Sequence, residues 1–486
     1  MSKPNILVIM TDQQRRDSLG CYGADWVPTP NLDRLASQGT LFEACTVNNP
    51  ICTPSRASIF TGRELPGHGV YRLHDNLPAD QMLFPELLRS KAGYRTALFG
   101  KQHVSGRVTE ERVRHPNDGY EIYEWCLEAS VGMESRFNGY VDWLRRVDPA
   151  FLDALRRDGR DVLHHPERVH FTSWAAERTS DFIRQQAKAG EPFFCLMSLF
   201  DPHNPYQDFP DAMAARIDAG RIPEPIARDT LPGTVRREQE GSYLGDARDL
   251  SREAIMTMRF GYAASLAFAD LKIGEVLATL DEVSLADDTL VIFLSDHGDA
   301  LGDHGMLVKS VALYEPVVGV PLILRWPGQV PAGKRSRALV QGHDIAGTCL
   351  SAAGLANAPA ESLDLTRVAK GDADGRAFAV CAYRNSGISN TGAYWDPPMQ
   401  STMVRSADHK LIAYASGGED EFELFDLRND PNEQTDRFGD PAYAAIQSTL
   451  MQALVGWLQN EAASIGSRGG SALPDASQQL DNTFKG

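Results

Sequence analysis

The sequence predicts an α/β fold in which helices sandwich a large, mostly parallel or mixed sheet, followed by a smaller C-terminal α+β domain with an antiparallel sheet. Short apolar runs alternate with helical patterns through most of the chain, which is typical of a parallel sheet covered on both faces. Near the C-terminus the apolar runs lie closer together and precede one amphipathic helical pattern, which predicts the smaller domain.

The apolar runs that we expect to form the large sheet mostly end in polar residues. The runs are residues 5–10, 96–99, 192–200, 289–294 and 320–325. In open α/β sheets, ligands bind beyond the carboxyl ends of the strands. The polar residues after these runs are therefore expected to meet at one site, and they include Asp12, Gln13, Lys101, His103, His203, Asp296 and His297.

The length of 486 residues accommodates one large and one small domain. We predict a catalytic domain over residues 1–370, a small α+β domain over residues 371–463 and a flexible tail or oligomer arm over residues 464–486. A linker rich in Gly and Asp separates the two domains at residues 370–375. In the small domain the predicted strands are residues 377–383, 403–406, 410–415 and 421–427, and the predicted helix is residues 443–463.

Two polar segments, residues 110–169 and 208–251, are predicted to be long loops over the catalytic face, where long loops are usually functional. A long helix is predicted at residues 252–280. The loops would form the walls of a substrate pocket together with residues 71–74, in which Arg72 is either a substrate contact or a solvated side chain.

The composition excludes several classes of protein. A hydrophobic fraction of 42% and a charged fraction of 23% are ordinary for a globular protein. The net charge of −17 argues against a nucleic acid partner, and an anionic substrate would need a locally positive pocket. No apolar stretch reaches the ~18 residues of a membrane span, so no membrane partner is expected. Residues 5–10 are too short a run for a signal peptide, and seven scattered cysteines suit a reducing compartment, so we predict a cytoplasmic protein.

The most informative segment is Cys52-Thr53-Pro54-Ser55-Arg56. Pro54 suits the first turn of a helix and Gly62 suits its end. Cys52 would then lie at the positive end of the helix dipole, a position that favours anions. Arg56 follows four residues later and projects from the same face. The alternative interpretation is a buried cysteine at the start of an ordinary helix.

Residues 49–63 resemble the signature of the type I sulfatases, in which Cys-x-Pro-x-Arg directs oxidation of the cysteine to Cα-formylglycine. The resemblance to this family of the alkaline phosphatase superfamily extends from Pro4 to about Leu427. The other matching segments are residues 11–14, 100–103, 295–298, 301–305 and 424–431. The resemblance implies a metal-dependent sulfatase, similar to the arylsulfatases, that hydrolyses a small anionic ester and depends on a formylglycine-generating enzyme for maturation.

The resemblance also implies a role for each matching residue. One divalent ion, Ca²⁺ or Mn²⁺, would be held by Asp12, Gln13, Cys52, Asp296 and His297. Oxidised Cys52 would be the nucleophile, as a hydrated aldehyde stabilised by Arg56. Lys101 and Lys309 would bind the nonbridging oxygens of the substrate. Lys309 or His203 would protonate the leaving alcohol, and His103 would accept a proton as the intermediate breaks down.

Two of these positions depart from the common pattern. Many calcium sulfatases carry Asp in place of Gln13 and Asn in place of His297. An imidazole in place of an amide oxygen shifts the metal preference towards manganese or zinc. The pairs Asp12-Gln13 and Asp296-His297 together also resemble those of the phosphonate monoester hydrolases, which use the same formylglycine. Gly319 replaces an Arg of many relatives, so the role of that Arg has no counterpart here.

Three functions therefore remain open at this point. The first is sulfate ester hydrolysis, and the second is hydrolysis of a phosphonate monoester or phosphodiester with the same residues. The third is a non-catalytic metal-binding or anion-binding protein in which Cys52 stays a thiol; the proton-transfer groups His103 and His203 argue against it. The remaining polar residues near the motifs are expected either to be structural or to support the site residues from behind, and they are His68, His74, Asp299, Asp303 and His304.

Overall fold

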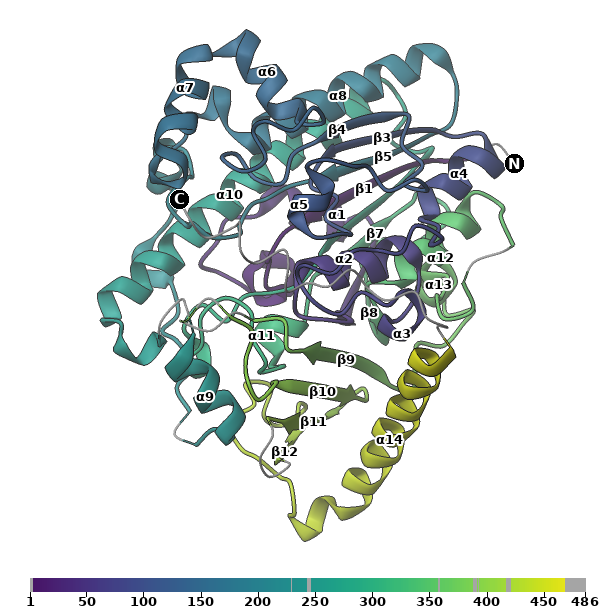
Figure 1. Ribbon diagram of the computed structural model, residues 1–486. Helices are drawn as coiled ribbons and strands as arrows, with labels where there is room; N and C mark the ends of the chain where they lie inside the picture. The colour runs from purple at the N-terminus through teal and green to yellow at the C-terminus, as the bar shows by residue number, and fades with distance from the viewer. Residues whose placement is uncertain are drawn as a thin grey trace.

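The computed structural model of the chain describes residues 3–228, 230–242, 246–356, 359–387, 391, 393–416 and 421–467. They form one large mixed sheet between two layers of helices and a second, smaller sheet beside it (Figure 1). The predicted fold class is confirmed.

The large sheet has eight strands in the order β4-β3-β5-β1-β6-β7-β2-β8. All neighbours are parallel except β7, which runs antiparallel to β6 and to β2. The strands are β1 (Asn5–Thr11), β2 (Thr40–Thr46), β3 (Arg95–Gly100), β4 (Ile122–Trp125), β5 (Phe193–Ser198), β6 (Thr289–Ser295), β7 (Leu322–Arg325) and β8 (Lys334–Gln341).

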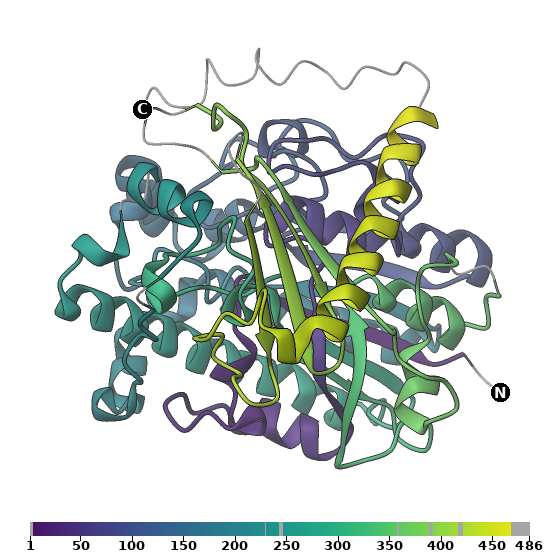
Figure 2. The same ribbon diagram turned by 90° about the horizontal axis from the view of Figure 1, so that it is seen from below.

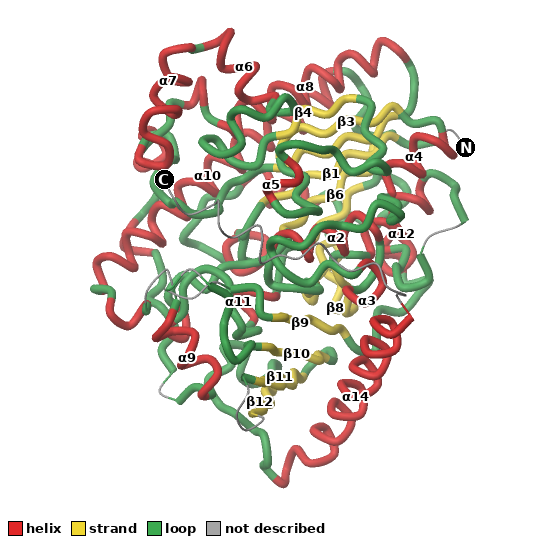
Figure 3. Tube along the Cα trace, viewed as in Figure 1, coloured by secondary structure: helices red, strands yellow, loops and turns green. Residues whose placement is uncertain are grey.

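Helices cover both faces of this sheet (Figures 1 and 3). Those before the small sheet are α1 (Pro30–Ser37), α2 (Cys52–Thr61), α3 (Leu65–His68), α4 (Phe84–Ala92), α5 (Arg107–Glu110), α6 (Gly139–Val147), α7 (Pro149–Asp158), α8 (Phe171–Ala189), α9 (Gly233–Gly241), α10 (Arg252–Glu282), α11 (Glu315–Val318), α12 (Asp344–Ala352) and α13 (Leu365–Lys370).

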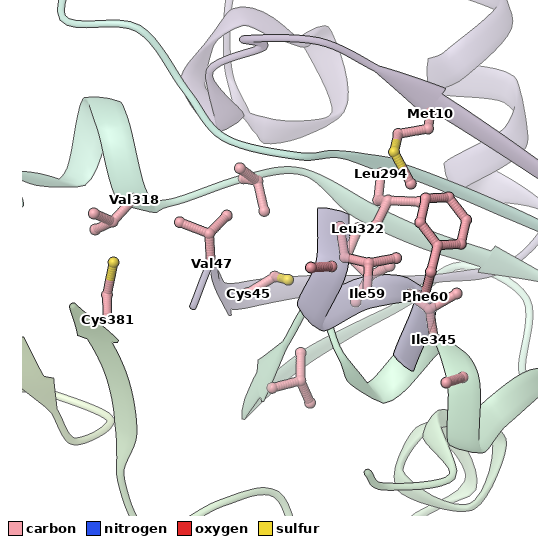
Figure 4. Packing of buried hydrophobic residues seen from close by; sticks show 14 of the residues in the cluster. Met10, Cys45, Val47, Ile59, Phe60, Leu294, Val318, Leu322, Ile345 and Cys381 are labelled. Atoms are coloured by element: carbon pink, nitrogen blue, oxygen red, sulfur yellow. The ribbon is translucent and has the colours of Figure 1, made fainter. Parts of the chain in front are cut away.

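Strand β1 is buried along its whole length because both of its faces meet helices. Ile6, Val8 and Met10 pack in a core under α2, α4 and α12, part of which is drawn in Figure 4. Leu7 and Ile9 point the other way, into a core under α8 and α10. A strand with two covered faces needs apolar residues at every position, and this is the continuous pattern that its sequence has.

The small sheet is antiparallel, in the order β12-β11-β10-β9. Its strands are β9 (Ala379–Arg384), β10 (Gln400–Arg405), β11 (His409–Ala415) and β12 (Glu421–Asp426). Helix α14 (Ala444–Ser467) runs along one face of it (Figure 2), where Leu450 and Leu454 pack on Leu411. The far part of α14 reaches the large domain, and Trp457 Nε1 donates to Glu64 Oε2 at 2.7 Å.

Several elements differ from the sequence-based expectation. The segment 110–169, expected to be loop, contains β4, α6 and α7, and the segment 208–251 contains α9. The strands β2 and β8 were not predicted, because β2 carries Glu43 and β8 begins with charged residues at the edge of the sheet. Helix α14 continues to Ser467, beyond the expected start of the tail at residue 464. The rest of that tail, residues 468–486, lies outside the described residues, and the domain boundary at residue 370 stays a prediction.

Among the residues that the structure describes, none of the helices combines the length and the apolar character that a membrane crossing requires.

Candidate active site

The ends of β1 and β6 bring together residues that are far apart in the sequence. The two strands are parallel neighbours, and Thr11 pairs with Ser295 at the last position of their register. Asp12 and Gln13 therefore leave the sheet beside Asp296, whose Oδ1 accepts a hydrogen bond from the Gln13 backbone N–H at 3.1 Å. The expectation that the carboxyl ends of the strands form one polar site holds for this pair.

Helix α2 carries Cys52 to the same place. Cys52 is its first residue, and Gly62, with a φ of 69°, ends the helix in the left-handed conformation. All ten residues of α2 are buried, because the helix lies between the sheet and α4 and α12. The thiol of Cys52 thus lies at a buried helix N-terminus, next to the carboxyl edge of β1 and β6.

Arg56 is fully buried and joins four parts of this site. Its Nε lies 2.6 Å from Asp296 Oδ2 and its Nη2 lies 3.2 Å from Asp12 Oδ2. Its Nη1 donates to the carbonyl of Lys101 at 2.8 Å and to Ser198 Oγ at 2.9 Å. Arg56 therefore neutralises and orients two carboxylates, and the resemblance had suggested that it holds the nucleophile.

Two lysines make the surroundings of Cys52 positive. Lys309 Nζ lies 2.9 Å from Cys52 Sγ, and Lys101 Nζ lies 2.5 Å from Asp12 Oδ2. Burial alone would raise the pKa of the Cys52 thiol, but Lys101, Lys309 and His297 together hold that pKa well below its usual value. In the same way, Lys101 and other cations hold the pKa of Asp12 below its usual range in spite of burial. The site stabilises negative charge at the position of the Cys52 sulfur.

Three histidines lie near Cys52. His297 Nε2 is 3.3 Å from Cys52 Sγ. His203 Nδ1 donates to the carbonyl of Asn204 at 2.7 Å, since a carbonyl can only accept, and His203 Nε2 is left to accept from Lys309 Nζ at 3.1 Å. His103 Nε2 lies 3.1 Å from Thr53 Oγ1.

His103 is a neutral imidazole near neutral pH. Its burial, together with the charge of Lys101, lowers its pKa to about 4. A neutral imidazole can accept a proton, which is what a general base requires.

The donor set fits a divalent cation. Asp12, Cys52, Asp296 and His297 each offer one ligand atom, and these atoms all lie within 4.8 Å of one another. Asp12 Oδ1 is buried without a hydrogen-bond partner among the described residues. A buried carboxylate oxygen without a partner is unfavourable unless a cation or donor meets it. The oxygen and nitrogen donors suit Ca²⁺, Mn²⁺ or a related ion.

Gln13 lies beside this set, and Asp299 fixes the orientation of its amide. Gln13 Nε2 donates to Asp299 Oδ2 at 2.7 Å, and the same Oδ2 accepts from Tyr206 OH at 2.7 Å. A carboxylate can only accept, so Gln13 must direct its NH₂ towards Asp299 and its Oε1 into the site, where Lys309 Nζ lies 3.2 Å away. Asp299 was expected either to be structural or to support the site residues, and the structure places its carboxylate against Gln13.

Sequence reasoning missed the role of Glu110. Its buried carboxylate accepts from the backbone N–H groups of His103, Val104 and Ser105 at 3.0, 2.7 and 3.2 Å. It also accepts from Trp125 Nε1 at 3.1 Å. The sequence carries no local signal for this role, because Glu110 looks like any acidic residue in a polar segment.

Comparison with known proteins identifies the class to which this fold and site belong. Residues 4–355 match the sulfatase family, and residues 302–460 match the family described as "N-sulphoglucosamine sulphohydrolase, C-terminal". The first match covers well over half of the chain, so the chain belongs to the sulfatase family, and it is a sulfuric ester hydrolase. The predicted family is confirmed.

Individual relatives span nearly the whole chain. The arylsulfatase of Clostridium perfringens is 28% identical, and the alignment covers 93% of this chain and 94% of the relative. The N-acetylglucosamine-6-O-sulfatase of Bacteroides thetaiotaomicron is 27% identical over 93% of this chain and 86% of its own length. Among solved structures, the phosphonate monoester hydrolase of Agrobacterium radiobacter has the same fold, with a TM-score of 0.76, 24% identity, and coverage of 94% of this chain and 96% of that one.

Proposed function

We propose that this site hydrolyses a small sulfate monoester with a formylglycine made from Cys52 as the nucleophile. The observation that carries the proposal is the position of the Cys52 sulfur. It lies at a buried helix N-terminus, 2.9 Å from Lys309 Nζ and 3.3 Å from His297 Nε2. The sulfur marks where an oxygen of the hydrated aldehyde would lie. The modification would supply two hydroxyl groups on one carbon, one to attack sulfur and one to release the sulfate.

We further propose that Asp12, Gln13, Asp296 and His297 hold one divalent cation together with residue 52. A bound cation would supply a Lewis acid that stabilises negative charge in the transition state. The ligand atoms of Asp12, Cys52, Asp296 and His297 lie within 4.8 Å of one another, which supports this assignment. The imidazole of His297 favours Mn²⁺ over Ca²⁺, because Ca²⁺ prefers oxygen ligands.

Side chains of the protein would then bind the substrate and transfer the protons. Lys101 and Lys309 bind the nonbridging oxygens of the sulfate and stabilise the charge that develops on them. Lys309 and His203 form the acid that protonates the leaving alcohol. Because His203 Nε2 accepts from Lys309 Nζ at 3.1 Å, a proton can pass along this pair. His103 accepts the proton that the second hydroxyl loses. Each such proton transfer typically contributes roughly 10²–10⁴-fold to the rate.

One observation favours a second candidate function. The site has an amide at Gln13 and an imidazole at His297, where many sulfatases place a carboxylate and an amide. One negative charge fewer near the nucleophile suits a substrate whose transition state carries more negative charge. The second candidate is therefore a phosphonate monoester or phosphodiester hydrolase that uses the same residues.

Comparison of kcat/KM for three substrates separates the two functions. The substrates are an aryl sulfate, an aryl phosphodiester and an aryl phenylphosphonate ester, each tested with Ca²⁺ and with Mn²⁺. We expect the aryl sulfate to have the highest kcat/KM, with Mn²⁺ the more effective ion. A higher kcat/KM for the phenylphosphonate ester would reverse the ranking of the two functions.

The proposal implies a maturation partner and a compartment. A formylglycine-generating enzyme would have to convert Cys52 before the protein is active. All seven cysteines are free thiols in the structure, which supports a reducing compartment such as the cytoplasm. Assembly into a homo-oligomer stays a proposal, and light scattering of the full chain tests it.

A further inference from the structure

A second group of metal-ligating side chains lies outside the active site. It consists of His165, His170 and Asp208, each of which offers one ligand atom within 4.8 Å of the others. All three are buried, with exposed fractions of 4%, 1% and 8%. His170 precedes α8, and Asp208 follows the loop after β5 that carries His203. The backbone N–H of His165 donates to the carbonyl of Asp208 at 3.0 Å and joins the two segments.

Each of these side chains has a polar atom with no hydrogen-bond partner among the described residues. The atoms are His165 Nδ1, His170 Nε2 and Asp208 Oδ1. Three buried polar atoms without partners in one place are unusual, since nearly all buried polar groups in native proteins are satisfied. Aromatic rings pack against both imidazoles. Phe151 lies against His165 and Phe268 against His170, at centroid distances of 5.2 and 4.7 Å.

The negative charges near His165, His170 and Asp208 favour binding of a cation. Asp201 Oδ2 lies 3.9 Å from His170 Nδ1, so two carboxyls, Asp201 and Asp208, are buried close together. Burial and the charge of Asp201 raise the pKa of Asp208. Among the described residues, neither carboxylate forms an ion pair with Lys or Arg. The nearby Arg160 pairs with Glu128, and Lys272 pairs with Glu167.

We propose that His165, His170 and Asp208 form a structural site for Zn²⁺, separate from the active site. Two imidazoles and one carboxylate, completed by a water molecule, are a donor set that this ion takes at catalytic sites. Here all three side chains are buried, so the ion would have a structural role. The ion would link the segment before α8, which contains His165 and His170, to Asp208 at the end of the loop that carries His203.

The hydrogen bonds of the two imidazoles determine how they would bind. His165 Nε2 lies 3.0 Å from the carbonyl of Val162 and must donate to it, so the lone pair of His165 is on Nδ1, the atom without a partner. His170 Nδ1 accepts from the backbone N–H of Thr172 at 3.1 Å. His170 Nε2 therefore carries the proton in this arrangement. Binding of zinc at Nε2 would move that proton to Nδ1, which would exchange the hydrogen bond from Thr172 for one to Asp201 Oδ2, 3.9 Å away. A carboxylate that accepts from a metal-bound histidine is common at zinc sites.

Two experiments on the full chain test the site, with zinc chloride as the probe. The first is an anomalous difference map, measured at the zinc edge, from crystals of the zinc-loaded wild type. We expect a peak between the three side chains, resolved from any peak beside Asp12. A map with no peak between His165, His170 and Asp208 would overturn the proposal, and the group would then be a water-bridged set of neutral side chains. The result does not depend on whether the active site is modified or active.

The second experiment counts zinc per chain by mass spectrometry after excess ion is removed. His165→Gln and Asp208→Asn are expected to retain one zinc fewer than the wild type and to lose its zinc-dependent rise in Tm. His164→Gln is the matched control, because His164 is the adjacent histidine and lies outside the group. Equal zinc content in all four proteins would contradict the site. If either variant fails to fold, the anomalous map of the wild type decides.

Discussion

At the scale of single residues, the direction in which the Gln13 amide points is decided by Asp299. The carboxylate accepts from Gln13 Nε2 and from Tyr206 OH, both at 2.7 Å. It thereby turns Gln13 Oε1 towards Lys309 Nζ, which lies 3.2 Å away. A carboxylate in place of Gln13 would face Asp299 with like charge, so the choice of an amide at this position has a physical reason.

We predict that Asp299→Asn weakens metal binding, because the new amide no longer forces Gln13 into one orientation. Loss of such an outer partner typically reduces metal affinity or activity by about 10–100-fold. Gln13→Glu alone should be at least as damaging. The double variant Gln13→Glu/Asp299→Asn keeps the total charge and reverses the hydrogen bond, and it should recover part of the loss. Titration of the metal-free proteins with Mn²⁺ by calorimetry measures this, and no recovery in the double variant would contradict the assigned orientation.

His203 gives a second prediction at this scale. If it helps to protonate the leaving group, His203→Ala should lower kcat/KM by roughly 10²–10⁴-fold for an alkyl sulfate, whose leaving group is strongly basic. For 4-nitrophenyl sulfate, whose leaving group needs little protonation, the loss should be much smaller. His203 is only partly buried, so the variant should fold. Equal losses for the two substrates would show that His203 does not act on the leaving group.

At the scale of elements, the loop after β3 depends on one carboxylate. Glu110, the last residue of α5, accepts from three successive backbone N–H groups that begin at His103. His103 has a φ of 56°, a conformation that a residue other than glycine keeps only when its surroundings hold it. Glu110 thus positions the proposed base through the backbone.

We expect Glu110→Gln to reduce kcat with little change in KM, because two of the four N–H donors would then face an NH₂ group. A buried donor without an acceptor costs about 1–3 kcal/mol, so Tm should also fall. Glu111→Gln is the matched control, since Glu111 is the neighbouring residue and its carboxylate forms, among the described residues, only a 3.6 Å ion pair with Arg107. Steady-state kinetics and thermal unfolding of both variants test this. If the two variants behave alike, Glu110 has no special role in the loop.

The elements that could be predicted from the sequence are those with an unbroken physical signal. β1, β5 and β6 are buried on both faces, so their continuous apolar runs identified them. β8 lies at the edge of the sheet and begins Lys334-Arg335-Ser336-Arg337, which reads as a solvated segment. The site residues at the strand ends were predictable for the same reason as the strands. The partner of Asp299 and the role of Glu110 were not, because these contacts are known only once the loops have folded against one another.

At the scale of the whole molecule, a buried ion network joins the two sheets. Lys410 of β11 is fully buried and lies 2.8 Å from Glu315 Oε1 and 2.7 Å from Glu433 Oε1. Glu315, in α11, also pairs with Arg405 of β10 at 3.0 Å and with Arg16 at 2.9 Å. The cations hold the pKa of Glu315 well below its usual value in spite of burial. The small sheet is therefore fixed to the segment that follows Lys309.

Lys410→Met should destabilise the protein strongly, because it leaves Glu433 without its cation. Removal of one partner of a buried pair typically costs about 3–5 kcal/mol. Arg337→Met is the control, since Arg337 also bridges the two sheets, to Asp408 at 3.1 Å, but is largely exposed. An exposed pair of this kind contributes about 0–1 kcal/mol. Urea unfolding of both variants measures the difference, and equal stability of the two would refute the network.

The measurement that tests the central claim most directly is the mass of the peptide that contains Cys52, taken from protein produced together with a formylglycine-generating enzyme. Formation of an aldehyde at residue 52, accompanied by turnover of an aryl sulfate that Cys52→Ala lacks, is the result that this account predicts. A thiol at residue 52 in protein that nevertheless hydrolyses the sulfate would contradict it.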